Sequence, residues 1–260
     1  MRIQGHLSDV WRYRFLLQNL VFRELKIKYK GAVLGVFWSM LQPLFLLLIY
    51  TFAFRYVVRI RVDHFPVFLF SVLLPWTFLS TSLGAGVSAI TDHGSLVKKI
   101  YFPRAVLPLA TVFFNLTQFL LTLLVFIPAL PLLDVPLTPA LLALPALIAL
   151  QLPFVAGLVL AASALYVSFR DLRHFVELLL QFWFWLTPVV YPLDMVPARF
   201  TPFFVLNPMV HFAGAYRKLI LAGQLPSIPE WLVLAALSGG FFAVGWRIFQ
   251  RRSPRFAEEV

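Results

Sequence analysis

The residues that could catalyse a reaction or bind a metal ion are scattered along this sequence. None of the five histidines forms an H-x-x-x-H pair, the spacing with which one face of a helix binds zinc. No pair of carboxylates in a predicted outer loop suits sugar chemistry. The motif Gly-Lys-Ser/Thr, which ends a phosphate-binding loop, does not occur. We therefore expect no catalytic site, metal or cofactor in this chain, and any ATP that powers it must bind to another polypeptide.

The stretch Ser95–Pro108, SLVKKIYFPRAVLP, combines basic and apolar side chains between two long uncharged runs. Each Lys or Arg at the centre of a bilayer would cost about 2.5–3.5 kcal/mol on insertion scales, so the stretch must lie at a membrane surface. We expect it to expose aromatic and aliphatic side chains there. A short element of this composition suits a docking site for another protein. The alternative is an ordinary cytoplasmic loop whose lysines extend toward water.

The composition indicates the protein class. Of 260 residues, 61% are apolar and 13% are charged, whereas soluble domains are about 25% charged. Several uncharged runs exceed the roughly 20 residues that cross a bilayer, which predicts an all-α polytopic membrane protein. The net charge of +11 then reflects cytoplasmic loops that face anionic lipid, not nucleic acid. Without cysteine, disulfides and thiolate metal sites are excluded. No cleavable signal peptide is expected.

Hydropathy predicts six transmembrane helices, preceded by an amphipathic helix over 8–30 that lies in the membrane interface. Basic residues of the 8–30 segment recur along a narrow stripe, and aromatic and aliphatic residues fill much of the remaining surface. The predicted spans are 31–54, 65–91, 105–133, 140–169, 175–193 and 231–249.

The segment 195–221 is uncharged over much of its length but is broken by Pro202 and by Asn207–Pro208. With six spans, the cytoplasmic side holds sixteen of the 22 Lys and Arg residues, counting the N-terminal segment, the second and fourth loops, the tail, and Arg247 at the end of the last span. A seventh span would move the arginine-rich tail outside, against the positive-inside bias. We therefore predict a re-entrant or surface helix pair on the outer side, with both termini in the cytoplasm.

Aromatic side chains within the spans could form a path for a substrate. Trp38, Phe45 and Phe52 are spaced seven apart and share a helix face, and Gln181 and Trp185 are four apart. Flat aromatic rings can stack on sugar rings without holding any one of them tightly, which suits a sliding polymer. Alternatively, these residues face lipid or a neighbouring helix. The absence of ionisable residues near the middle of any span argues against a proton- or sodium-driven transporter.

Several stretches resemble one family, the ABC-2 type polysaccharide exporters. Tyr29–Tyr50, YKGAVLGVFWSMLQPLFLLLIY, is similar to the beginning of that family's first span. Within Phe68–Pro108, LLPWTFLSTSL runs into SLVKKIYFPRAVLP as in the same family. Tyr191–Met195 (YPLDM), Asn207–Pro208 and Ala215–Arg217 resemble its outer gate region. These proteins are the membrane subunits that export O-antigen, capsular polysaccharide or teichoic acid.

The resemblance implies a homodimer in the bacterial plasma (inner) membrane, paired with two copies of a separate ATPase that binds ATP and Mg. It implies a polymer substrate carried on a polyprenyl pyrophosphate lipid. The implied coupling segment is 95–104, with the contact residues Leu96, Val97, Lys98, Lys99, Tyr101, Phe102, Pro103 and Arg104. The implied channel is aromatic, for which the candidates are Trp38, Phe45, Phe52, Gln181 and Trp185. The implied outer gate contains Tyr191, Pro192, Asn207, Pro208 and Arg217.

From sequence we therefore expect the channel-forming subunit of an ATP-driven exporter, with O-antigen as the favoured cargo. A first alternative is an ABC-2 exporter of capsule, teichoic acid, or a small lipid or drug. A second is an integral-membrane glycosyl or acyl transferase, which would cluster acidic or histidine residues on one side. A third is a membrane scaffold without transport.

Overall fold

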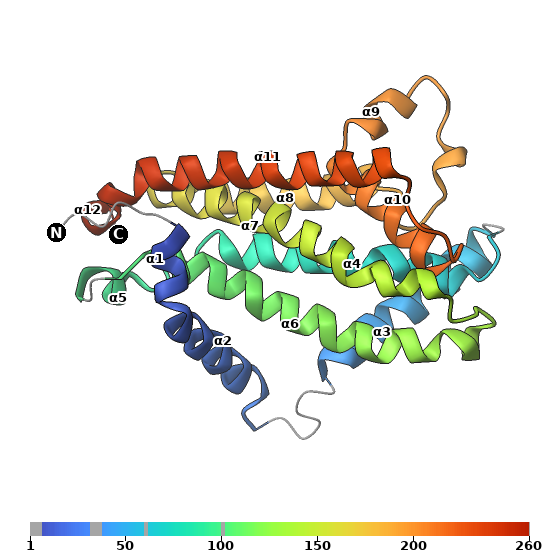
Figure 1. Cartoon of the computed structure of the whole chain (residues 1–260), viewed down its shortest axis with the longest axis horizontal. Coiled ribbons are helices and arrows are strands. Elements are labelled where there is room, and N and C mark those ends of the chain that lie inside the picture. Colours follow the sequence, from blue (N-terminus) through green and yellow to red (C-terminus); the bar gives the residue numbers. More distant parts are fainter. Residues whose placement is uncertain (1–6, 32–37, 60–61, 100–101, 260) are drawn as a thin grey trace.

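The computed structural model describes residues 7–31, 38–59, 62–99 and 102–259, and within these ranges it contains helices and turns but no strand (Figure 1). The predicted all-α class is therefore confirmed. The longer helices are α2 (Arg14–Tyr29), α3 (Trp38–Thr51), α4 (Phe65–Gly86), α6 (Val106–Ala129), α7 (Leu144–Ser168), α8 (Leu172–Leu186), α10 (Pro208–Ile220) and α11 (Ile228–Arg252). The shorter ones are α1 (Leu7–Arg12), α5 (Gly94–Lys99), α9 (Thr201–Val205) and α12 (Phe256–Glu259). Single π or 3₁₀ turns are η2 (Phe52–Val57), η3 (Leu130–Leu133), η4 (Pro139–Ala143), η5 (Leu193–Met195) and η6 (Ser253–Arg255).

Four helical stretches in the described ranges are long and apolar enough to cross a bilayer. They are Phe65–Gly86, Val106–Leu133, Pro139–Ser168 and Ile228–Arg255. The chain is thus an α-helical, multi-pass membrane protein.

The other two predicted spans are shorter in the structure. The first corresponds to α3 and the π-helix η2, while residues 32–37 of that prediction lie outside the described ranges. The fifth corresponds to α8, whose 15 residues reach about 22 Å, less than the roughly 30 Å of a hydrocarbon core. Pro188 explains the early end of α8, because a proline disfavours helical backbone at the residue before it, and Thr187 is extended with ψ 125°. Six spans therefore remain a prediction.

The segment predicted as one helix over 8–30 is split in two at Tyr13. The amide of Tyr13 is shared between the carbonyls of Asp9 and Val10, at 3.1 and 3.2 Å, so the turn tightens and the helix axis changes direction. Below the break, α2 lies against α6: Leu20 is buried, and the Tyr29 hydroxyl donates to Gln118 Oε1 at 2.6 Å. This helix is therefore attached to the bundle. Large apolar side chains such as Phe15, Phe22 and Ile27 are exposed on it beside the basic ones, and a place in the membrane interface stays a prediction.

Helix α4 forms the centre of the bundle, with α6, α7, α8 and α10 packed around it. At one end of the bundle lie α1, α5 and α12, and at the other lie α9 and α10 (Figure 1). The segments predicted as cytosolic thus gather at one end, and those predicted as outer gather at the opposite end.

Helices α7 and α11 approach each other most closely at two glycines. A Cβ on Gly245 would overlap the carbonyl oxygen of Gly157, and a Cβ on Gly157 would overlap that of Phe241. Ser238 adds a hydrogen bond from its hydroxyl to the Leu150 carbonyl at 2.6 Å. Small residues and cross-helix hydrogen bonds are the usual means by which helices associate in lipid.

We predict that Gly245→Ala destabilises the protein by about 1–3 kcal/mol, because the added methyl must push α7 and α11 apart. Thermal unfolding followed by tryptophan fluorescence in detergent measures this loss. Gly240→Ala is the matched control on the same helix, since a methyl group added at Gly240 would meet no neighbouring atom within 4 Å. Equal unfolding temperatures for the two variants would contradict the assignment of this contact.

Candidate functional site

Asn207 joins the predicted outer gate to the end of α8. Its Oδ1 accepts from the Met209 amide at 3.0 Å, which caps α10, and from Trp183 Nε1 at 2.7 Å. Its Nδ2 donates to the Leu186 carbonyl at 3.0 Å and to Thr187 Oγ1 at 3.1 Å. The last carbonyls of a helix lack partners within that helix, so one amide side chain here satisfies the end of α8 and the start of α10 together.

Arg217 makes a second connection between the same elements. Its Nη2 donates to the carbonyls of Pro188 and Val189, at 2.5 and 3.0 Å. Its guanidinium lies 3.6 Å from the centroid of the Phe68 ring on α4, a close cation–π contact. Arg217 therefore fastens α10 to both α4 and the chain that leaves α8.

The remaining predicted gate residues lie along the same chain. The Tyr191 hydroxyl donates to the Trp185 carbonyl near the end of α8. Pro192 precedes the turn η5, and Pro208 is the first residue of α10, a position where its missing N–H has no cost. The structure thus brings Tyr191, Asn207 and Arg217 to the carboxyl end of α8. Whether they gate a channel stays a prediction.

A buried hydrogen-bond chain continues from this cluster into the bundle. The Tyr216 hydroxyl donates to Gln151 Oε1 at 2.7 Å, and Gln151 Nε2 donates to the Pro75 carbonyl at 2.9 Å. Tyr216 and Gln151 are fully buried. This chain joins α10, α7 and α4. Sequence reasoning included Tyr216 in the gate-like stretch Ala215–Arg217 but gave it no role, and the available signal for this chain was Gln151, a lone amide in an apolar run.

We predict that Asn207→Ala lowers stability by about 1–3 kcal/mol, because the truncation leaves the Trp183 indole N–H and the amide of Met209 without their acceptor. The Trp183 fluorescence should shift as that hydrogen bond is lost, and thermal unfolding measures the stability. Asn19→Ala, at an exposed position of α2, is the control. If both variants unfolded at the parent's temperature, Asn207 would not hold the two helices together.

The predicted channel residues lie on exposed surfaces of α3, η2 and α8. Trp38, Phe45 and Phe52 are 49%, 55% and 65% exposed, and both Gln181 and Trp185 are exposed on α8. Helices α3 and α8 contact each other where Tyr50 stacks on Phe184, with ring centroids 6.2 Å apart. So much exposed aromatic surface must face lipid or another chain. A channel-lining role stays a prediction.

The predicted coupling segment lies at the opposite end of the bundle. Lys98 is exposed and Leu96 is partly exposed, whereas the side chain of Lys99 and all of Tyr101 lie outside the described residues. The expectation that the apolar side chains here are exposed is wrong for two of them: Val97 and Phe102 are only 5% and 6% exposed. They pack against the core and so anchor the segment beneath its basic surface. Pro103 is buried as well.

Arg104 points inward, to the 253–259 segment. Its Nη1 donates to the Ser253 carbonyl, and its guanidinium lies 6.0 Å from the centroid of the Phe256 ring. These partners make Arg104 part of the internal packing at this end of the bundle. Sequence reasoning did not connect residues so far apart.

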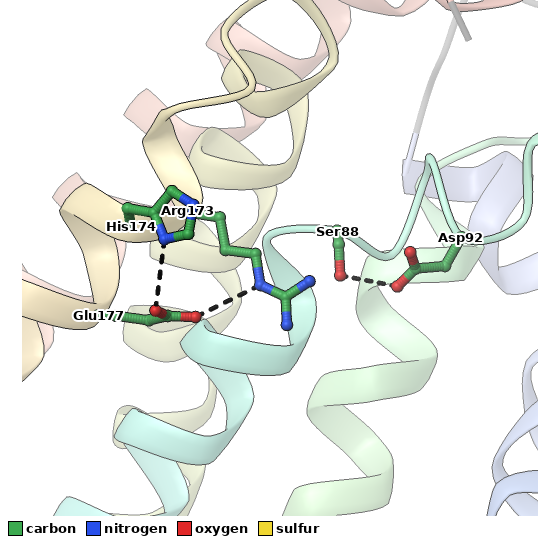
Figure 2. A network of polar contacts seen from close by, with 5 residues as sticks. All are labelled: Ser88, Asp92, Arg173, His174 and Glu177. Carbon is green, nitrogen blue, oxygen red and sulfur yellow. Dashed lines mark hydrogen bonds and ion pairs between the residues drawn. The ribbon is translucent and has the colours of Figure 1, made fainter.

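A polar network adjoins α5 at the same end (Figure 2). Ser88 Oγ donates to Asp92 Oδ2 at 2.7 Å in the turns after α4. On α8, Glu177 pairs with Arg173 at 3.3 Å and with His174 at 3.7 Å, and the Arg173 guanidinium extends toward Ser88 (Figure 2). The two pairs of Glu177 are exposed, so each contributes little stability. They leave charges of both signs beside the coupling segment.

The comparisons with known proteins identify the family. A family model described as ABC-2 type transporter matches residues 16–221, from α2 to the end of α10. The chain belongs to the ABC-2 type transporter family. Membership of a transporter family is consistent with the lack of a catalytic motif in the sequence.

Relatives that match this ABC-2 chain over most of their length are named as export or transport proteins. It is 38% identical over 258 residues to the O-antigen export system permease protein RfbA of Myxococcus xanthus, covering 98% of each chain. It is 32% identical to a protein of the same name from Klebsiella pneumoniae, over 98% of this chain and 96% of the relative. The polysialic acid transport protein KpsM of Escherichia coli is 24% identical, over 91% and 93% of the two chains.

Proposed function

We propose that this ABC-2 chain is the channel-forming membrane subunit of an ATP-driven exporter of O-antigen linked to polyprenyl pyrophosphate. The polymer moves from the cytosol to the outer face of the bacterial inner membrane. The observation that carries this proposal is the 38% identity, over nearly the full length of both chains, to an O-antigen export permease. The 24% identity to a polysialic acid transport protein makes export of another surface polysaccharide the second candidate.

Two copies of the chain assemble with two copies of a separate ATPase, which supplies the ATP and Mg site that this sequence lacks. Six segments cross the membrane, namely α3 with η2, α4, α6, α7, α8 and α11, and both termini lie in the cytosol. The exposed aromatic surfaces of α3 and α8 face the partner copy and line the path between the copies. Exposure of Trp38, Phe45, Phe52 and Trp185 supports this placement, because a path for sugar needs unoccupied ring faces.

Helix α4 transmits movement between the two ends. It leads through the turns at 87–93 into α5, which the ATPase contacts, and the Tyr216–Gln151–Pro75 hydrogen bonds connect it to α10. Closure of the ATPase displaces α5, and the packed helices carry this displacement to the outer gate as a rigid-body movement. The hydrogen bonds of Asn207 and Arg217 make α10 move together with the end of α8.

Co-expression with a partner ATPase, in cells that lack their own O-antigen permease, tests the function. We expect the pair to restore O-antigen at the cell surface and to purify with a mass of two copies of each chain. Restored capsule without restored O-antigen would favour the second candidate. A folded, membrane-inserted pair that exports neither polymer would overturn the proposal.

The coupling assignment makes its own prediction. The double variant Lys98→Glu, Lys99→Glu should insert normally but lose most of its bound ATPase, because a positive contact surface becomes negative. Co-purification measures the bound ATPase, and surface O-antigen measures export. Arg251→Glu is the control, an exposed reversal near the same end of the bundle but outside α5. Normal co-purification of the double variant would show that these lysines are not the contact.

A further inference from the structure

The 253–259 segment, comprising η6 and α12, lies between α5 and the loop that joins α7 to α8. Its centre is Phe256, which is fully buried and meets the Phe249 ring edge-on with centroids 5.4 Å apart. A side chain of this size, buried at the end of the bundle, is a strong anchor, because it removes a large apolar surface from solvent.

On one side the segment contacts the coupling segment. Arg104, directly after Pro103, donates from Nη1 to the Ser253 carbonyl and lies over the Phe256 ring. Helix α12 itself packs against α5. Arg104 is only partly exposed, so this charge-assisted hydrogen bond is partly protected from water, which strengthens it.

On the other side the segment contacts the start of the α7–α8 loop. Ser168 Oγ donates to Glu259 Oε2 at 2.6 Å and accepts from Arg252 Nη1 at 3.1 Å. Arg170 Nη2 donates to the Glu259 carbonyl at 3.5 Å. Arg252 also lies 5.4 Å from the centroid of the Phe169 ring. The end of α11, the end of α7 and the last turn of α12 are thereby connected.

We propose that the 253–259 segment positions the coupling helix: it holds α5 at a set distance from the α7–α8 loop, so that force on α5 reaches α7 and α11 as well as α6. Apart from this segment, α5 is joined to the rest of the bundle by the chain at 87–93 and 102–105 and by the packing of Leu96, Val97 and Phe102 against the core. Phe256, Ser168 and Glu259 are then positioning residues for energy coupling. This inference rests on the proposed function of α5 as the ATPase contact.

The lack of native cysteine allows a direct distance measurement. Spin labels at Ser95→Cys and Asp171→Cys, both exposed positions, report the separation of α5 from the α7–α8 loop in the assembled complex. We expect a narrow distance distribution in this labelled parent and a broad one when Phe256→Ala is added. Phe256→Leu, which keeps most of the buried volume, should restore a narrow distribution, and Arg255→Gln, an exposed neighbour in the same segment, should leave it unchanged.

Export per ATP hydrolysed separates positioning from a purely structural role. In Phe256→Ala we expect the ATPase to remain bound and active while polymer exported per ATP falls about fivefold, a size typical of coupling between sites. If Phe256→Ala does not fold, the pair Ser168→Ala, Glu259→Gln removes the other contact at exposed positions and should broaden the distribution in the same way.

The inference is overturned if the distances stay narrow in these variants, or if export declines only in proportion to the amount of complex formed. Failure of the proposed function has a different signature: the unaltered chain would then bind no ATPase and export no polymer. The distance measurement on the permease alone still distinguishes a held α5 from a free one in that case.

Discussion

Burial of α4 on all sides is the constraint on which the rest of the structure depends. Sixteen of its 22 residues are buried, so α6, α7, α8 and α10 must each present a surface that fits it. In lipid there is no hydrophobic drive between helices, and close packing with a few hydrogen bonds holds them together. The aromatic contacts of Phe70 with Phe126, and of Trp76 with Trp183 and Phe184, supply much of that packing.

Polar groups inside such a bundle determine how its helices pack, because each group must be hydrogen-bonded. An unsatisfied donor or acceptor in hydrocarbon costs several kcal/mol, so Gln151 selects the one arrangement in which both Tyr216 and the Pro75 carbonyl reach it. Asn207 and Arg217 act in the same way at the end of α8. These few side chains therefore specify how α10 packs against the bundle, and they connect it to α4.

The two ends of the bundle differ in how they are held. At the end that carries α10, the side chains of Asn207 and Arg217 donate hydrogen bonds to carbonyls at the end of α8 and just beyond it. The α5 end depends instead on apolar anchors, namely Val97, Phe102 and Phe256, beneath exposed charges such as Lys98. Buried apolar anchors with an exposed basic surface allow a partner to bind without unfolding the element that it pushes. Under the proposed function, this arrangement suits a part that must receive force repeatedly.

Much of this protein could be predicted from its sequence. Long uncharged runs predict membrane helices because hydrocarbon accepts little else, and stretches such as 140–169 nearly coincide with helices in the structure. The missing phosphate-binding loop and the basic, apolar stretch around Lys98 are local features, so they too can be recognised from the sequence. The motifs around Asn207–Pro208 pointed to the ABC-2 family for the same reason.

Only the tertiary structure decided which distant side chains meet. Arg104 and Ser253 are 149 positions apart, and Tyr216 and Gln151 are 65 apart, and no local periodicity relates such pairs. Their contact depends on how α7, α10 and α11 pack around α4. The same packing buried Val97 and Phe102, although the composition of the stretch around Lys98 predicted that they would be exposed. A helix of six residues such as α5 is held by its neighbours and not by its own hydrogen bonds.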